Sequence, residues 1–142
     1  MDELKFAVIG NPVSHSLSPD IHLFFASQFQ LERYTYNKIK SNENDFERDI
    51  NDFFKNGGMG LNVTVPFKGL AYHLCDELDQ SAELCKSVNT VLIDSGKLIG
   101  HSTDGQGLID DFLHKEITLE DSKILIIGAG GSAASIISSL LS

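Results

Sequence analysis

Apolar residues recur along this chain in two periods, and each change of period predicts a change of element. Strands are predicted by short apolar or alternating runs at 5–10, 33–39 and 60–65. In the third run Leu61, Val63 and Val65 share one face, which we expect to be buried. Asn62 and Thr64 share the other face, which carries only small hydrogen-bonding groups and is unusual for a strand turned toward water.

Apolar residues at helical spacing fill the intervals between these strands. Helices are predicted over 18–29, 44–56, about 67–74 and about 79–86. In the first helix we expect Ser18 to be the N-cap and Pro19 to occupy the first helical position. The second helix should end at Gly57 and Gly58.

The second half of the chain continues the alternation. Residues 88–100, VNTVLIDSGKLIG, predict a hairpin that turns at Ser95 and Gly96. A helix is predicted over 104–116, then a polar linker, then a strand, a glycine turn and a helix within 123–142. Alternating strands and helices predict an α/β fold: an open, mainly parallel sheet flanked by helices in three layers.

The last segment predicts the beginning of a second domain. A dinucleotide-binding unit needs a returning strand after its first strand and helix. We therefore expect a substrate-binding catalytic domain over 1–116 and the first βα unit of an incomplete Rossmann domain over 117–142, so that the chain is a fragment. Such a unit buries too little surface to offset an ordering cost of roughly 1–2 kcal/mol per residue.

Composition narrows the class of protein. The chain has 142 residues, is 42% hydrophobic and carries a formal charge of −9 without a basic patch, which disfavours nucleic acid as a partner. Its first apolar run is too short for a signal peptide or membrane span. The two cysteines lack Cys-x-x-Cys spacing and the five histidines lack a zinc pattern. We expect reduced thiols and a cytoplasmic, metal-free protein without nucleic-acid or membrane partners; a homodimer is left open.

Two polar clusters are candidates for chemistry. Ser16 and Ser18, in GNPVSHSLSP, precede a helix whose free N–H groups favour an anion, although plain capping is the alternative. Lys68 is expected in the first turn of its helix, where the dipole disfavours a cation, and Asp104 at the start of another helix is its obvious partner. The alternatives are a solvated lysine and an aspartate that only stabilises its helix. Asn89 lies in an otherwise apolar strand and needs hydrogen-bond partners.

A glycine turn, GAGGSAA from Gly128, stands between a predicted strand and helix, as a diphosphate site requires. It lacks the Lys-Ser/Thr ending of a P-loop, which disfavours an ATP- or GTP-using enzyme.

Taken together and in order, GNPVSHSLSP, NVTVPFK, SVNT, STDGQG and GAGGSA resemble the shikimate dehydrogenase family from residue 8 to about 140. The resemblance implies reversible NADPH-dependent reduction of 3-dehydroshikimate to shikimate in aromatic amino-acid biosynthesis. It implies that Lys68 and Asp104 form the catalytic pair. The implied substrate-binding residues are Ser16, Ser18, Asn62, Thr64, Lys68, Asn89 and Asp104, and the implied cofactor-binding residues are Gln80, Gly128, Ala129, Gly130, Gly131, Ser132 and Ala133.

Two departures from the family pattern affect these expectations. Ser102 stands where the family usually has asparagine, and the chain is about half the usual length. The residues that would select NADP over NAD are not part of this sequence. We expect the fragment alone to bind shikimate weakly and to be inactive; the alternative is a truncated, non-catalytic module that binds a shikimate-like ligand.

Overall fold

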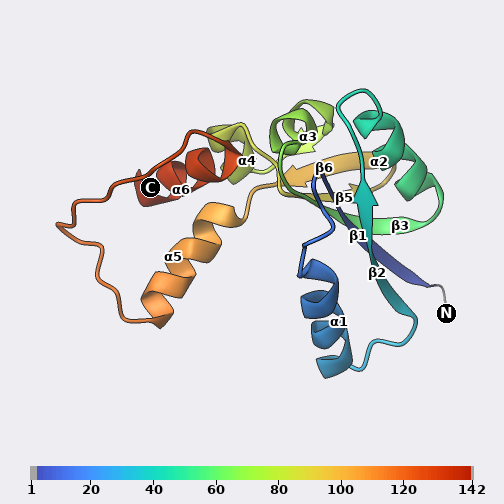
Figure 1. The fold of residues 1–142 in the computed structure, drawn as a ribbon, viewed down its shortest axis with the longest axis horizontal. Coiled ribbons are helices and arrows are strands. Elements are labelled where there is room, and N and C mark those ends of the chain that lie inside the picture. The colour runs from blue at the N-terminus through green and yellow to red at the C-terminus, as the bar shows by residue number, and fades with distance from the viewer. Residues whose placement is uncertain (1–2, 142) are drawn as a thin grey trace.

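The computed structural model describes residues 3–141. Figure 1 shows strands and helices that alternate for most of the chain. Their bounds are β1 Leu4–Gly10, α1 Ser18–Gln28, β2 Tyr34–Lys40, α2 Phe46–Lys55, β3 Gly58–Val63, α3 Lys68–Leu74, β4 Glu77–Leu78, α4 Gln80–Cys85, β5 Thr90–Asp94, β6 Lys97–His101, α5 Asp104–His114 and α6 Gly131–Leu141.

The sheet is six-stranded, in the order β2-β1-β3-β5-β6-β4. The strand β1 pairs in parallel with β2 and β3, and β4 pairs in parallel with β6. The strand β5 pairs antiparallel with β3. It also pairs antiparallel with β6, because the predicted hairpin brings β6 back beside it. The expected α/β class with a helix-flanked sheet is confirmed, and the hairpin makes the sheet mixed.

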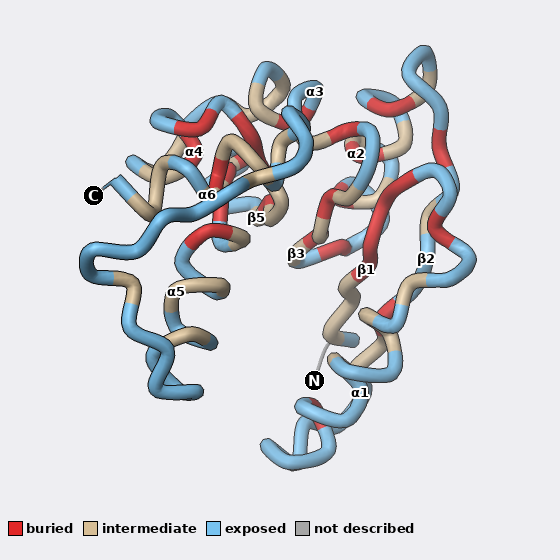
Figure 2. Tube along the Cα trace, turned by 60° about the vertical axis from the view of Figure 1, so that its left-hand side comes forward, coloured by how far each residue is buried: buried red, intermediate tan, exposed pale blue. Residues whose placement is uncertain are grey.

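Two hydrophobic clusters lie on opposite faces of the sheet. Along β1, Ala7 and Ile9 join the larger cluster, which α2, α3 and α4 cover. Val8 points to the other face, where it packs with Val13 and Tyr36 beside α1. Buried residues concentrate in the strands and in the helices of the larger cluster (Figure 2). The two faces therefore give the three layers expected from the alternating pattern.

The polar-faced strand ends earlier than predicted. The structure ends β3 at Val63, and the side chain of Val65 is 62% exposed, so its predicted burial is wrong. The next residue, Pro66, has no N–H with which to extend the ladder. Leu61 and Val63 are buried as expected.

The predicted N-cap of the first helix is also wrong. Ser18 is the first residue of α1, and Leu17 is the N-cap without a capping side chain. The backbone N–H of Ser18 instead donates to Ser16 Oγ at 3.2 Å. Ser16 and Ser18, which both have side chains suited to capping a helix, are therefore hydrogen-bonded to each other.

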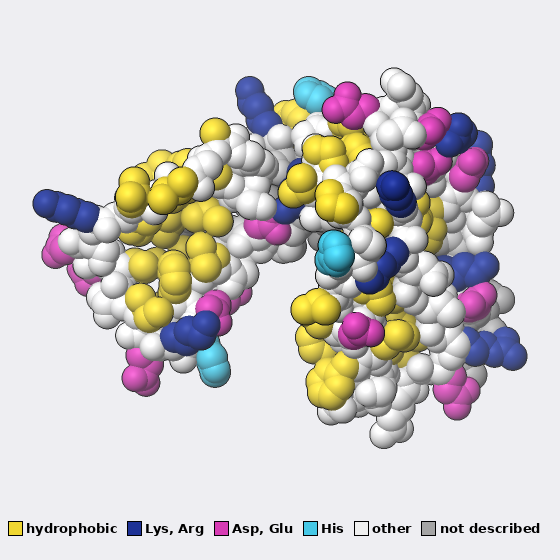
Figure 3. Space-filling view, in the orientation of Figure 1, with side chains coloured by type: hydrophobic (Ala, Val, Ile, Leu, Met, Phe, Trp, Pro, Cys, Tyr) yellow, Lys and Arg dark blue, Asp and Glu magenta, His cyan; other side chains and the backbone are white. Residues whose placement is uncertain are grey.

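The strand expected within 123–128 does not form. This segment belongs to no strand, and Leu125 and Ile127 are 84% and 90% exposed. A strand needs a neighbour that supplies its hydrogen bonds, and the described part of the chain provides none there. The helix α6 does form, and it packs against α4 and α5. Together α5 and α6 make a lobe beside the sheet, separated from α1 by a hollow (Figures 1 and 3).

Candidate functional site

The candidate site lies at the carboxyl ends of β1 and β3, where open α/β sheets place their ligands. Lys68 is the first residue of α3, and Asp104 is the first residue of α5. The Lys68 ammonium pairs with Oδ2 of Asp104, and the two side chains are 13% and 23% exposed. Two residues that are 36 positions apart in the sequence are thus joined in a partly buried place.

Asn89 holds the other side of this carboxylate. Its Nδ2 donates to Asp104 Oδ1 at 2.7 Å, and its Oδ1 accepts the N–H of Thr103 at 3.1 Å. Its backbone is fixed as well, because its carbonyl accepts the N–H of Val63 at 2.8 Å. Asn89 therefore ties the end of β3 to the start of α5. It directly precedes β5, which begins at Thr90, so its predicted place within the strand is wrong, whereas its predicted need for hydrogen-bond partners is confirmed.

Asn62 on the polar face of β3 is fully engaged by its neighbours. Its Nδ2 donates to the Asn89 carbonyl at 3.3 Å and to Thr90 Oγ1 at 3.2 Å. Its Oδ1 accepts from the Tyr36 hydroxyl at 2.6 Å. The polar strand face is thus one hydrogen-bonded surface that extends from β2 to β5.

Sequence reasoning missed Tyr36 and His22. Burial raises the pKa of Tyr36 to about 12, although a hydrogen bond with Ser18 acts in the other direction. The ring of His22 stacks on Tyr36 with centroids 4.3 Å apart, and burial lowers the pKa of His22. For His22 the sequence did contain a signal. It lies four residues after Ser18, so the two side chains share one face of the predicted helix.

A cavity of about 240 Å³ connects these residues. It is lined by Val8, Ser18, His22, Asn62, Val63, Thr64, Lys68, Asn89 and Asp104. The structure therefore brings together all the predicted substrate-binding residues except Ser16, whose hydroxyl supports the cavity indirectly by donating to Ser18 Oγ at 3.1 Å.

A second cavity of about 460 Å³ lies on the other side of Lys68, which lines both. Its lining includes Gly128, Gly130, Gly131, Ser132 and Ala133 from the predicted cofactor set. Ala129 lies in the same turn without lining the cavity, and Gln80 is exposed at the start of α4 and lines neither cavity.

The glycine turn approaches the catalytic pair closely. Ser132 Oγ accepts from Lys68 Nζ at 2.9 Å and lies 3.2 Å from Asp104 Oδ2. A Cβ on Gly131 would meet Ser87 Oγ at 2.4 Å, so only glycine allows this approach. Ser87 Oγ is buried without a hydrogen-bond partner among the described residues. A small-residue turn at the start of α6 fits a diphosphate held by backbone N–H groups.

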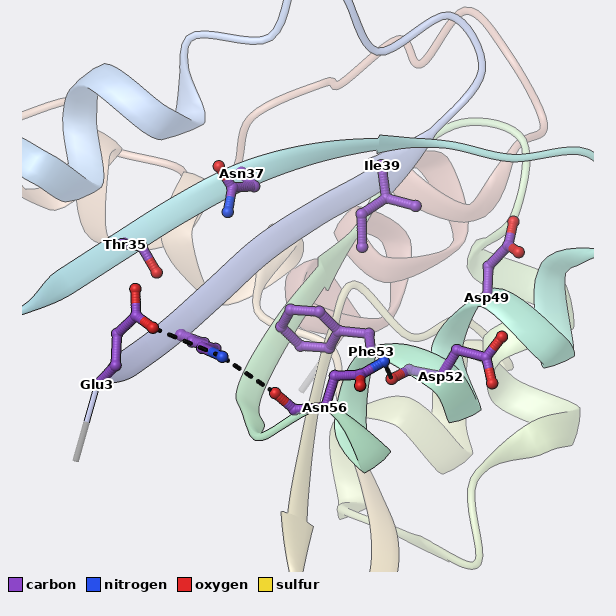
Figure 4. A pocket seen from close by; sticks show the side chains of 9 residues that line it. Glu3, Thr35, Asn37, Ile39, Asp49, Asp52, Phe53 and Asn56 are labelled. Carbon is purple, nitrogen blue, oxygen red and sulfur yellow. Dashed lines mark hydrogen bonds and ion pairs between the residues drawn. The ribbon is translucent and has the colours of Figure 1, made fainter.

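A third cavity, of about 520 Å³, lies between β1, β2 and α2, away from the candidate residues (Figure 4). Lys5 crosses it, paired with Glu3 at 3.5 Å and donating to the Asn56 carbonyl at 3.2 Å. None of the predicted site residues lines this cavity.

Within residues 3–141 no group of three or more His, Cys, Asp or Glu side chains could hold a metal ion. No helix in that range is both long and apolar enough to cross a membrane. Both cysteines are free thiols, as predicted, and burial raises the pKa of Cys75 to about 11.

Residues 8–91 match the family model for the shikimate dehydrogenase substrate binding domain. The chain belongs to the shikimate dehydrogenase family. A relative named shikimate dehydrogenase (NADP(+)), from Acinetobacter baylyi, is 44% identical over 133 residues, which are 94% of this chain and 50% of the relative.

Solved shikimate dehydrogenases share the fold. The Thermus thermophilus enzyme in complex with NADP(H) and shikimate has a TM-score of 0.90 at 32% identity, over 97% of this chain and 52% of that one. The Listeria monocytogenes enzyme with shikimate and NAD has a TM-score of 0.88 at 32% identity, over 98% and 48%. The chain spans about half the length of these shikimate dehydrogenases.

Proposed function

We propose that this chain carries the substrate-binding and proton-transferring half of an NADP-dependent shikimate dehydrogenase, an oxidoreductase that interconverts 3-dehydroshikimate and shikimate. One observation carries the proposal: the Lys68–Asp104 pair stands between a polar cavity and a cavity lined by a glycine turn. A hydride donor in one cavity and a carbonyl in the other would meet at this pair.

The polar cavity suits a small hydroxylated acid. Ser18, with Ser16 hydrogen-bonded behind it, would hold the carboxylate of the ligand at the start of α1, where helix N–H groups favour an anion. Thr64, Asn89 and Asp104 would hold the ring hydroxyls, and Asn62 would keep that wall in place. Because the chain is acidic overall, the ligand is captured by short-range donors rather than by long-range attraction.

The proton steps belong to Lys68 and Asp104. Bound NADPH would supply the hydride to the carbonyl carbon. As negative charge develops on the carbonyl oxygen, Lys68 Nζ donates a proton to it, which yields the hydroxyl of shikimate. Asp104 holds Lys68 in place for the transfer, and the neutral amine left behind then takes up a proton from solvent, which restores the ammonium for the next turnover.

We infer that residues 1–116 form the substrate-binding domain and that 117–142 begin the nucleotide-binding one. The glycine turn and Ser132 would then contact the cofactor diphosphate. The name of the Acinetobacter baylyi relative supports NADP, while the Listeria monocytogenes structure holds NAD.

The test is to join residues 1–141 to the part of the Acinetobacter baylyi relative that follows the match, and to assay this chimera. It should reduce 3-dehydroshikimate with NADPH, while the same chimera with Asp104→Ala should not. A folded chimera that binds shikimate without turnover would favour the non-catalytic binding module instead. A chimera that does not bind shikimate would refute both functions.

A further inference from the structure

A buried pair of serines joins α6 to the start of α5. Ser135 of α6 is 3% exposed and Ser102, two residues before Asp104, is 4% exposed. Their hydroxyl oxygens lie 2.9 Å apart, in hydrogen-bond contact. Ser135 Oγ also accepts the backbone N–H of Gly105 at 3.0 Å.

This second bond supplies what α5 lacks. The first N–H groups of a helix have no partner within the helix and need an acceptor from elsewhere. The N-cap of α5, Thr103, offers no side-chain hydrogen bond. Ser135 therefore caps α5 from a different helix, at the residue that directly follows Asp104.

The two helices are fitted to each other at this point. A Cβ on Gly105 would lie 2.3 Å from the Ser135 carbonyl oxygen and 2.2 Å from Ser139 Oγ. The loop before α5 is anchored from α4 as well, since Ser81 Oγ donates to the Ser102 carbonyl at 2.7 Å. Asp104 thus begins a helix whose first turn is fixed on two sides.

We propose that Ser135 is a positioning residue for Asp104: its hydroxyl, presented by α6, fixes the first turn of α5 and so aims the Asp104 carboxylate at Lys68. The effect of Ser135 on catalysis rests on the proposed function. The effect of Ser135 on the position of Asp104 does not depend on that function. Through Ser135, the helix α6 that follows the glycine turn also contributes to the substrate site. Its contribution matters because errors well below 1 Å in the placement of catalytic groups already lower the rate.

Two variants of the 142-residue chain separate positioning from packing. Ser135→Ala and Ser102→Ala both remove the hydrogen bond between the serines, but only Ser135→Ala also leaves the Gly105 N–H without its acceptor. By NMR, Ser135→Ala should speed amide exchange at Gly105 by about 10-fold or more, and Ser102→Ala by less than about 3-fold.

The side-chain amide of Asn89 reports on Asp104 itself, because its Nδ2 donates to Asp104 Oδ1. Its signal should move in Ser135→Ala and stay near the parental position in Ser102→Ala. Equal effects of the two variants on Gly105 and on Asn89, or no effect of Ser135→Ala on either, would overturn the proposal.

A shikimate titration of the same samples keeps this inference apart from the proposed function. Positioning predicts that Ser135→Ala weakens shikimate binding by about 10-fold, and Ser102→Ala by no more than about 3-fold. A parent chain that does not bind shikimate would count against the proposed function, while the Gly105 and Asn89 signals would still decide the role of Ser135.

Discussion

The polar atoms of Lys68 and Asp104 nearly all have assigned partners. Asp104 accepts from Asn89 at Oδ1 and from Lys68 at Oδ2. An ammonium carries three donors, and those of Lys68 reach Asp104 and Ser132. Among residues 3–141, one donor therefore remains for a ligand in the cavity that Lys68 lines, as a proton donor to a substrate oxygen requires.

Replacing this lysine should impair turnover more than binding. In the chimera described above, Lys68→Ala should lower kcat by about 10²–10⁴-fold with a smaller change in KM, because the proton is transferred in the transition state. Steady-state assays test this, with Lys115→Ala as the control because the Lys115 side chain is 58% exposed and pairs with Asp111, away from the candidate site. A kcat within a few-fold of the parent would remove Lys68 from the mechanism.

The two serines at the start of α1 should matter for the acid group of the ligand. A hydrogen bond to a charged group contributes about 1.5–3 kcal/mol, so Ser16→Ala with Ser18→Ala should weaken shikimate binding at least about 10-fold. The measurement is calorimetric titration of the chain, and Ser27→Ala on the exposed part of the same helix is the control. An unchanged Kd would leave these serines only a structural role.

His22 should make the stability of the protein depend on pH. Burial lowers its pKa in the folded state, so the unfolded state binds the proton more readily and folding stability falls as pH decreases through about 6.5. His22→Phe keeps a ring against Tyr36 and removes this titration. Urea midpoints at pH 7.5 and 5.5 should therefore differ less in the variant than in the parent; an identical difference would refute this assignment.

At the scale of elements, local patterns were predictable from the sequence. The hairpin turns at Ser95 and Gly96, which have φ values of 50° and 81°, and Asp104 begins α5. Gly57, with φ of 86°, ends α2 as its position indicated. These features depend on a few neighbouring residues, so one sequence is sufficient to predict them.

Features that depend on distant partners were not predictable. The strand within 123–128 has suitable residues but no neighbouring strand among the described residues. Hydrogen bonds join Asn62 to Tyr36 and Ser135 to Gly105, and in each case the two residues lie on separate elements. Such contacts are decided by tertiary packing, which periodicity does not encode.

Two glycines in α5 should respond in opposite directions to the same substitution. Gly105→Ala would place a Cβ 2.3 Å from the Ser135 carbonyl, so it should destabilise the chain by forcing α5 and α6 apart. Gly107→Ala meets nothing within 4 Å and should stabilise the helix by up to about 1 kcal/mol. Urea unfolding of both variants tests this, and similar midpoints would contradict the tight helix contact.

At the scale of the whole molecule, the site depends on residues from both ends of the chain. On one side, β3 supplies Asn62, the loop after β3 supplies Thr64, and α1 supplies Ser18. The lobe of α5 and α6 supplies Asp104 and Ser132 on the other side. Both lobes must keep their relative position for the two cavities to meet at Lys68.

From this arrangement we expect the 142-residue chain to have different affinities for shikimate and NADPH. The residues of the polar cavity lie mainly on helices and strands that pack against the core, so the cavity is formed in this chain. We therefore expect the chain to bind shikimate, although weakly. The segment 123–130 is largely exposed and belongs to no strand, so NADPH binding and turnover should not be measurable. Calorimetric titration with each ligand checks this; tight NADPH binding would show that the cofactor site needs less of a sheet than we infer.

The same exposed segment bears on the tendency of the chain to associate in concentrated solution. Residues 124–127 read ILII, without a charge or a proline, and Leu125 and Ile127 are almost fully exposed. Backbone groups outside any strand, beside such side chains, form a template on which a second chain can add as a strand. We therefore expect these four residues to promote association of the chain in spite of its net charge of −9.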